Sequence, residues 1–461
     1  MKKFFRYFFI ALTAIIVIAL IVVAITFPPV MAGMAAKTMC SCVYVTGRTP
    51  ESVRQQELQV FPGLASSNIE VNNADSTVTA SVFWKTSQAI YRKGVGCTLL
   101  AQQGEATVRS QKLSIAGPPT LQQDSLAWPS GNILPDSAAA GVDYDAVNRA
   151  IDQAFADKDP KGPVFTHAVI AVYDGRIIGE KYADGFNRDS RMMGWSMTKS
   201  ITNALIGILV KQGKLDVNAP APVAEWQNDE RKAITLNNLL QASSGLEWSE
   251  TYFTPWADFH QMFIHSDDKA AYAAARPLKH QPGGFFQYSS GTTNILSRII
   301  RQTTGDDQYY RFPYEQLFYK IGMNQAIIEA DASGTFVASS YSYASARDWA
   351  RFGMLYLNDG MWNGERILPE GWVKYSTSPA PAAPLREYGA QIWLNLGDPK
   401  DPTKVDRPGL PTEMILFDGF ERNYVAVIPS KKLVVVRLGV THNSNFSLPD
   451  LVNGMIKALP Q

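Results

Sequence analysis

The chain has 461 residues, which is too many for one small domain and predicts two or three structural units. Its 43 Lys and Arg against 42 Asp and Glu give a formal net charge of +1, so the charge balance does not favour a nucleic-acid partner or an acidic one. Hydrophobic residues make up 46% of the chain, which is enough for a sizeable core.

The first 35 residues predict a cytoplasmic basic flank followed by a transmembrane anchor. Basic residues within positions 1–6 precede an almost wholly apolar run at 7–27, and about 20 helical residues span a bilayer core. This run is longer than the apolar part of most signal peptides, although small residues at 31–36 leave cleavage open. We expect Pro28-Pro29 to end the helix and the basic flank to stay in the cytoplasm. The sequence thus predicts a single-pass inner-membrane protein, its catalytic part periplasmic or extracellular.

Residues 36–120 predict a small β-rich module. The segment 67–84 alternates polar and apolar residues, as a half-buried strand does. All three cysteines, Cys40, Cys42 and Cys97, lie in this module. In an exported protein we expect Cys97 to form a disulfide with Cys40 or with Cys42. Three cysteines without a nearby histidine do not make a zinc site, so we expect no metal here.

Residues 121–461 predict an α+β unit. Residues 143–159 and 344–367 have the spacing of amphipathic helices, and 166–186 reads as a hairpin around Asp174-Gly175. We expect residues 216–285 to be mainly helical, and strands return in YGAQIWLN, NYVAVIP and KLVVVRLGVTHN. Strands on both sides of a helical block predict an antiparallel sheet flanked by helices, with an inserted helical domain at about 216–285.

The motif Ser196-x-x-Lys199 is the strongest chemical signal of the chain. It begins a predicted helix within residues 194–215, so both side chains lie on one face of it. Free backbone N–H groups and the positive end of the helix dipole surround a serine at such a position. A buried lysine one turn later can accept the hydroxyl proton. The pattern therefore indicates an activated serine nucleophile, whereas the alternative is a helix-capping serine followed by an exposed lysine.

A second copy of the motif, Ser266-x-x-Lys269, lies in a polar stretch. It has no apolar helix behind it, so we interpret it as a solvated loop or helix end.

A tyrosine at the start of another predicted helix supplies a second acid or base. Tyr288-x-Ser290 precedes the helical pattern of residues 291–305, and a phenol can exchange protons when a cation such as Lys199 lies near it. Tyr343-x-Ser345 is a rival, but it precedes a helix with the spacing of a core element.

Three motifs in this order carry a resemblance to a known family: Ser196-x-x-Lys199, Tyr288-x-Ser290 and Phe417-Asp418-Gly419. Together with phrases such as ITLNNLLQASSGLEW and ARFGMLYLNDGMWNGERILPEGW, they cover about residues 125–453. The chain resembles the serine β-lactamase-like superfamily, in its class C-related branch. That branch includes class C β-lactamases, D-aminopeptidases, family VIII esterases and aminohexanoate-oligomer hydrolases, and the last two look most similar. The resemblance implies a β-lactamase/transpeptidase-like fold.

The resemblance also implies roles for individual residues. Ser196 would be the nucleophile, Lys199 its base or proton relay, and Tyr288 the acid that protonates the leaving group. Ser290 stands where many relatives have Asn or Ser. The backbone N–H groups of Ser196 and Phe420 would form the oxyanion hole.

One motif departs from the family pattern. β-Lactamases and penicillin-binding proteins carry Lys-Thr-Gly where this chain has Phe417-Asp418-Gly419. A phenyl ring and an acid cannot hold a substrate carboxylate, and Asp418 would repel an anion or attract an amine. We therefore expect an ester, a linear amide or an amine-bearing substrate rather than a β-lactam.

Taken together, these features predict a membrane-anchored serine hydrolase that forms an acyl-enzyme on Ser196. Its substrate would be a small-molecule ester, an amide or a short oligomer, and it would need no metal or organic cofactor. One alternative is a peptidoglycan-directed D-aminopeptidase, carboxypeptidase or β-lactamase; the other is a non-catalytic envelope protein that binds peptides or wall fragments. None of the five histidines lies in a metal-binding pattern, and we expect His442 to be structural.

Overall fold

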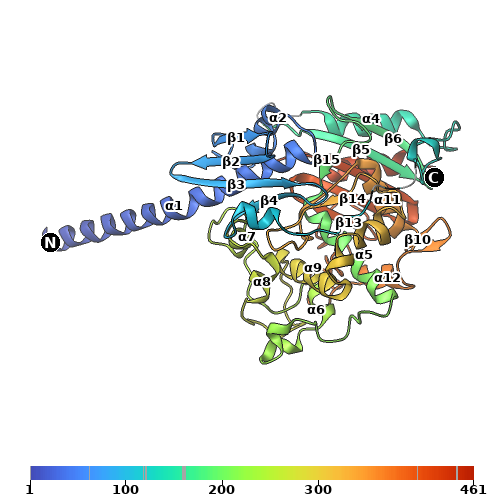
Figure 1. Cartoon of the computed structure of the whole chain (residues 1–461). Coiled ribbons are helices and arrows are strands. Elements are labelled where there is room, and N and C mark those ends of the chain that lie inside the picture. The colour runs from blue at the N-terminus through green and yellow to red at the C-terminus, as the bar shows by residue number, and fades with distance from the viewer. Residues whose placement is uncertain are drawn as a thin grey trace.

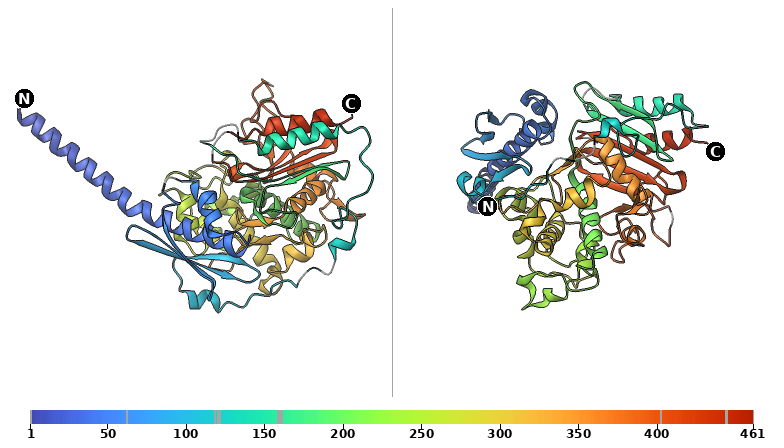
Figure 2. Two further views of the ribbon diagram at one scale, coloured as in Figure 1. Left: turned by 90° about the horizontal axis from the view of Figure 1, so that it is seen from above. Right: turned by 45° about the vertical axis from the view of Figure 1, so that its right-hand side comes forward.

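The computed structural model describes residues 2–61, 63–117, 119, 122–157, 162–401, 403–442 and 445–460. A long helix leaves the body of the molecule and ends at the N-terminus (Figure 1). The body contains a small N-terminal sheet, a large central sheet with helices on both faces, and a region of short helices and loops (Figure 2).

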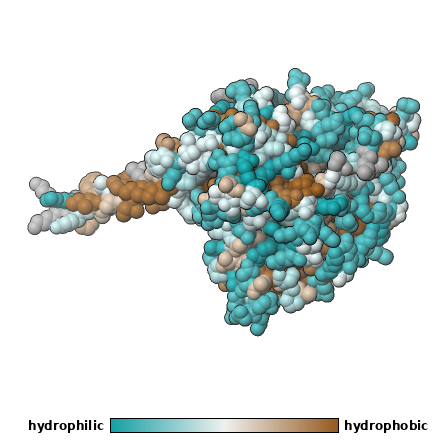
Figure 3. All heavy atoms as spheres, in the orientation of Figure 1, coloured by the Kyte–Doolittle hydropathy of each residue, from teal (hydrophilic) through white to brown (hydrophobic). Residues whose placement is uncertain are grey.

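Helix α1, Lys2–Tyr44, has two different halves. Its first part projects from the body and is covered with exposed apolar side chains (Figure 3). The helix is long and apolar enough to cross a membrane, by length and composition. From Val30 onward it is buried in the protein, with Ala35 and Met39 fully covered.

The prediction that Pro28-Pro29 ends this helix is wrong, because α1 continues through both prolines to Tyr44. A proline inside a helix costs about 3 kcal/mol. The side chains beyond the prolines pack against the N-terminal sheet, and each fully buried apolar side chain returns about 1.5–3 kcal/mol. Tertiary packing therefore outweighs the local preference, and the expected domain boundary at 35/36 falls inside a continuous helix.

The N-terminal sheet is antiparallel, with its strands in chain order: β1 Asn68–Asn72, β2 Thr77–Val82, β3 Lys85–Arg92 and β4 Gly96–Leu100. The second half of α1 packs on it, α2 Pro50–Gln55 packs against α1, and α3 Glu105–Arg109 contacts β3 through hydrogen bonds to Gln88 and Tyr91. Cys40 of α1 and Cys97 of β4 form a disulfide with an S–S distance of 1.99 Å, whereas Cys42 is free and buried. Of the two pairings expected, the structure contains this one.

The central sheet has six antiparallel strands in the order β12-β13-β14-β15-β5-β6. Their bounds are Trp393–Leu394, Ile415–Gly419, Asn423–Ile428, Leu433–Gly439, Thr166–Tyr173 and Arg176–Tyr182. The hairpin β5–β6 is confirmed: Asp174 and Gly175 both have left-handed backbone angles, with φ of 44° and 78°, as a tight two-residue turn requires.

Helices cover both faces of this sheet (Figure 2). Helices α4, Tyr144–Phe155, and α13, Leu448–Ala458, pack on one face. On the other face lie α11, Ala346–Leu357, and beyond it α5, Thr198–Lys211, which is buried from Thr198 to Leu209. The α+β architecture with an antiparallel sheet flanked by helices is confirmed. The last two residues of the helix predicted at 143–159 lie outside the described residues.

The prediction that residues 216–285 are mainly helical is wrong, because helices make up less than half of this stretch. Within residues 216–285 the α-helices are α6 Leu236–Leu240, α7 Asp258–His265 and α8 Lys269–Ala274, and turns and loops make up most of the rest of this described stretch. Prolines and glycines recur throughout it, and both residue types interrupt helices. The other α-helices and strands of the described residues are α9 Ser290–Thr304, α10 Asp306–Tyr309, α12 Trp372–Ser376, β7 Met192–Met193, β8 Ile327–Ile328, β9 Ser342–Ala344, β10 Met361–Trp362 and β11 Glu365–Arg366.

Candidate active site

Ser196 lies in a tight turn between the strand β7 and helix α5. The turn is the short 3-10 helix η3, Trp195–Met197, and α5 begins at the next residue. Trp195 has a left-handed backbone, with φ of 48°, so the chain is bent sharply just before the serine. The sequence prediction that Ser196 stands at a helix start agrees with this position.

Strand β13 lies directly against this turn. A Cβ on Gly419 would come within 2.3 Å of the Gly194 carbonyl oxygen, so only glycine lets the two backbones approach. The next residue, Phe420, begins another 3-10 helix, η7 Phe420–Arg422, and its ring packs edge-on against Trp195 at 5.4 Å. Ser196 is in the first turn of a helix, where backbone N–H groups have no acceptor within the helix, whereas Phe420 begins a kinked turn in which Glu421 and Arg422 have left-handed backbone angles, with φ of 65° and 62°.

Lys199 contacts Ser196 from one turn further along α5. Its Nζ donates to Ser196 Oγ at 3.0 Å, to Ser290 Oγ at 3.2 Å and to the backbone carbonyl of Ser339 at 2.9 Å. The side chain is buried, and burial lowers the pKa of Lys199 to about 8. A lysine with this pKa is partly neutral near neutral pH, and can therefore accept a proton.

Tyr288 completes the cluster. Its ring centroid is 4.9 Å from Lys199 Nζ. Burial holds the pKa of Tyr288 well above its ordinary value, and a hydrogen bond with Ser196 opposes this shift. The phenol therefore keeps its proton at neutral pH, which suits a proton donor better than a base.

Ser290 is held by a residue that the sequence reasoning missed. Ser289 caps helix α9, and Glu250 accepts hydrogen bonds from Ser290 Oγ at 2.5 Å and from the Ser290 N–H at 2.9 Å. Trp248 Nε1 donates to the same carboxylate at 2.5 Å. The negative charge of Glu250 also raises the pKa of Lys199 against the effect of burial. Glu250 follows Ser196 by 54 positions without a helical or strand pattern, so spacing gave no signal for it.

The expectation that Phe417 lines the site is wrong. Successive side chains of a strand point to opposite faces, and the Phe417 ring is fully buried in the core, about 5 Å from the rings of Phe352 and Tyr356 on α11. Asp418 faces the other way and forms an ion pair with Arg407. Its charge is therefore compensated, which weakens the expectation that it attracts an amine or repels an anion.

The second Ser-x-x-Lys motif is structural. Lys269 Nζ donates to the Ser266 carbonyl, and Ser266 Oγ donates to the Asp268 carbonyl, so this serine and lysine do not form a nucleophile pair. The prediction of a solvated loop there is wrong, since Lys269 is buried, whereas the predicted helix end is correct. In the rival Tyr343-x-Ser345, Ser345 caps α11 as part of a capping box, whereas Tyr343 lines the cavity at Ser196.

The expected structural role of His442 is confirmed. It contacts Glu421 Oε2 at 2.6 Å through Nδ1, and the Gln56 carbonyl at 2.8 Å through Nε2.

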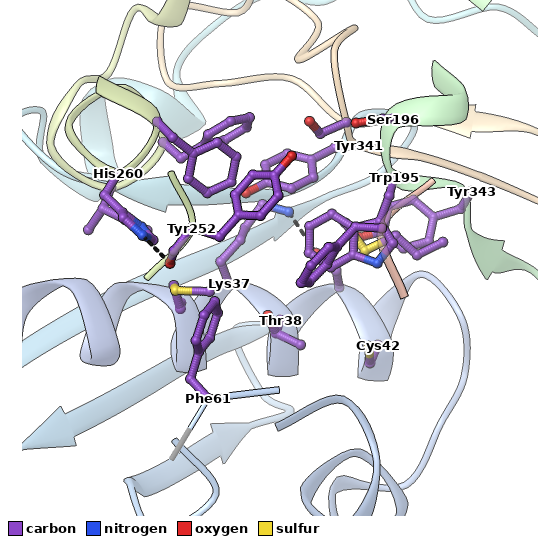
Figure 4. A pocket seen from close by; sticks show the side chains of 18 residues that line it. Lys37, Thr38, Cys42, Phe61, Trp195, Ser196, Tyr252, His260, Tyr341 and Tyr343 are labelled. Carbon is purple, nitrogen blue, oxygen red and sulfur yellow. Dashed lines mark hydrogen bonds between the residues drawn. The ribbon is translucent and has the colours of Figure 1, made fainter. Parts of the chain in front are cut away.

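Ser196 lines a cavity in the body of the molecule. Figure 4 shows Ser196 on one side of it and α1 on the opposite side, with Lys37, Thr38 and Cys42 labelled on the helix. Tyr252 and Tyr341 lie between them. The contact of α1 with this site was not predicted, because the helix was expected to end before residue 30.

The part of the chain that contains this site is similar in sequence to known proteins. The Beta-lactamase family model matches residues 151–451. A 6-aminohexanoate-dimer hydrolase from Paenarthrobacter ureafaciens is 26% identical over 226 residues, which are 45% of this chain and 56% of that protein, so the match spans little more than half of the relative's length.

Solved structures share the fold. A putative 6-aminohexanoate-dimer hydrolase from Bacillus anthracis has a TM-score of 0.54 at 23% identity, over 76% of this chain and 90% of that one. A family VIII carboxylesterase has a TM-score of 0.53 at 16% identity, over 71% of this chain and all of that one. The family match covers most of the chain, and it contains the turn of Ser196 and the strand beside it. The chain therefore belongs to the Beta-lactamase family of serine hydrolases.

Proposed function

We propose that this protein is a membrane-anchored serine hydrolase that cleaves an ester or a linear amide bond through an acyl-enzyme on Ser196. The observation that carries the proposal is the 3.0 Å contact between Lys199 Nζ and Ser196 Oγ, with the lysine buried and its pKa lowered to about 8. The names of the similar proteins, an aminohexanoate-dimer hydrolase and a carboxylesterase, support an amide or an ester as the bond cleaved.

The proposed reaction uses the cluster in two steps. Lys199 takes the Ser196 proton while Oγ attacks the carbonyl carbon, and the N–H groups of Ser196 and Phe420 stabilise the oxyanion. Tyr288 then gives its proton to the leaving alcohol or amine and is reprotonated from Lys199. In the second step water attacks the acyl carbon, and its proton passes through the same groups to Ser196 Oγ. The bond between Oγ and the acyl carbon breaks, and the acid leaves.

The anchor is part of the proposal. The apolar surface of the first part of α1 suits a bilayer core (Figure 3). Basic residues at the start of the sequence favour a cytoplasmic N-terminus. The hydrolase would then lie in the periplasm or outside the cell. The Cys40–Cys97 disulfide supports that location, since disulfides persist in oxidising compartments.

A fluorophosphonate tests the proposed nucleophile directly. Treatment of the detergent-solubilised full chain should add one label, which intact-mass spectrometry counts and peptide mapping assigns to Ser196. The Ser196→Ala variant should remain unlabelled. A folded wild-type protein without an adduct, or a label elsewhere, would contradict the proposal and favour the non-catalytic binding protein.

The pH dependence should follow the titration of Lys199. Because only the neutral amine accepts a proton, kcat/KM should rise with pH and reach half its plateau near pH 8. Glu250 raises the pKa of Lys199, so Glu250→Gln should move this midpoint to lower pH while the amide still contacts Ser290. A pH–rate series on both proteins measures the shift. A lower rate with an unchanged midpoint would mean that Glu250 acts on the structure alone.

A further inference from the structure

The cavity at Ser196 has a wall made by the same helix that we propose as the membrane anchor. Met34, Thr38 and Cys42 lie four residues apart, on one face of α1, and all three line the cavity. Helix α7 supplies Phe259, Phe263 and Ile264, while aromatic residues next to Ser196 close the remaining sides. The binding space therefore lies between the N-terminal module and the hydrolase unit.

The lining of this cavity presents no uncompensated charge among the described residues. Lys37 is the one lysine or arginine among the described residues that line it, and its Nζ forms an ion pair with the fully buried Glu329. The same Nζ lies 2.8 Å from Ser41 Oγ and 3.8 Å from the ring centroid of Tyr341. Burial lowers the pKa of His260, so this lining residue is neutral at pH 7. A ligand would therefore meet rings and methyl groups rather than an uncompensated charge.

A second cavity lies beside the first along α1. Met34, Thr38 and Cys42 line it too, and its other lining residues include Arg191, Glu421 and the ion pair of Arg48 and Glu57. The two cavities share Trp195 and Phe420 as neighbours of the serine. A chain longer than a few carbon atoms could therefore extend from Ser196 along the helix.

The cavity also lies near the expected membrane surface. Met34 follows Phe27, the last residue of the apolar run, by seven positions, or about 10 Å along a helix. Phe83 lines the same surface hollow as Phe27, and Phe83 and Trp84 are 80% and 63% exposed at the tip of the β2–β3 hairpin. Aromatic side chains exposed at this level suit the membrane–water interface.

An exposed apolar ring also connects the cavity to the outside. Phe61 lines the cavity, and its ring centroid is 5.2 Å from that of Phe253, which is 74% exposed.

We propose that the substrate is an amphiphile of the bilayer, an ester or amide with a long apolar acyl chain, and that this chain binds along the α1 face of Met34, Thr38 and Cys42. This inference rests on the proposed function. Ser196 Oγ would form a bond to the acyl carbon while the bond to the alcohol or amine breaks, and the serine proton would reach that leaving group through Lys199 and Tyr288. Water would later add its hydroxyl to the acyl carbon and return its proton to Ser196.

Chain-length selectivity tests the binding face. With full-length protein in detergent, kcat/KM for p-nitrophenyl dodecanoate should exceed that for the acetate by at least about tenfold. Thr38→Trp fills the cavity and should lower this ratio at least about tenfold, and Met34→Trp should do the same from the preceding turn. Thr107→Trp, at an exposed site on α3, is the matched control and should leave the ratio unchanged. A flat wild-type profile, or a ratio that neither cavity variant changes, would overturn the inference.

Lateral access from the bilayer needs its own measurement. The protein in phosphatidylcholine vesicles should hydrolyse 1-monooleoylglycerol faster when the lipid is in the same vesicles than when it is in separate ones. Equal rates would contradict a bilayer source. Failure of the proposed function is distinguishable, because Ser196 would then take no fluorophosphonate and esters of every length would remain intact.

Discussion

Replacing Ser196 with alanine should reduce kcat/KM for ester and amide substrates by at least about 10⁴-fold while leaving the fold intact. The reason is local: Ser196 Oγ is the hydroxyl that Lys199 contacts at 3.0 Å, and no acyl-enzyme can form without it. Lys199 keeps its contacts to Ser290 and Ser339 in the variant, so the buried amine retains partners and stability should change little. Hydrolysis of p-nitrophenyl esters, together with thermal unfolding, measures both effects.

The chain offers a matched control in its second Ser-x-x-Lys motif. Ser266→Ala removes a hydroxyl that donates only to a backbone carbonyl, and it should keep wild-type activity. Substantial activity in Ser196→Ala, or a large loss in Ser266→Ala, would show that the wrong serine has been assigned.

The contrast between these two motifs explains what the sequence could predict. Ser196 and Lys199 are three residues apart across the junction of the 3-10 turn Trp195–Met197 and the buried helix α5, so their side chains lie on one face. Ser266 and Lys269 have the same spacing, yet the lysine contacts a backbone carbonyl. What separates them is the apolar pattern that follows Ser196, and this pattern is readable from the sequence. Tyr288 and Ser290 were found because they begin a recognisable helix.

The parts that the sequence could not give depend on distant packing. Glu250 reaches Ser290 through an irregular loop, so no periodic pattern relates the two residues. Phe417 was assigned by its place in a motif, but strand alternation turns its ring into the core. The prolines at 28 and 29 predicted a helix end, whereas the sheet that covers α1 beyond them lies 40 to 70 residues later in the sequence. Because the helix was expected to end at these prolines, the sequence did not predict that α1 lines the cavity.

Lys199→Met and Tyr288→Phe should each lower kcat/KM by about 10²–10⁴-fold, and the double variant should lose little more than the worse single one. In the proposed reaction both groups serve one proton path, and in the structure Lys199 contacts Ser196 and lies 4.9 Å from the Tyr288 ring centroid. Removal of either group stops proton transfer along this path. Removal of the other group as well should therefore lower the rate little further. Because methionine and phenylalanine fill nearly the same volume as the residues they replace, the loss should be chemical rather than a packing defect.

A double-mutant cycle on one ester substrate tests this coupling. Tyr375→Phe is the matched control, because it removes a phenol that donates to Asn237 on the neighbouring helix α6, and it should leave the rate within about twofold of the wild type. Losses that simply multiply in the double variant would mean that Lys199 and Tyr288 act independently. In that case Tyr288 would act on the leaving group without a relay from the lysine, and the proton would have to come from solvent.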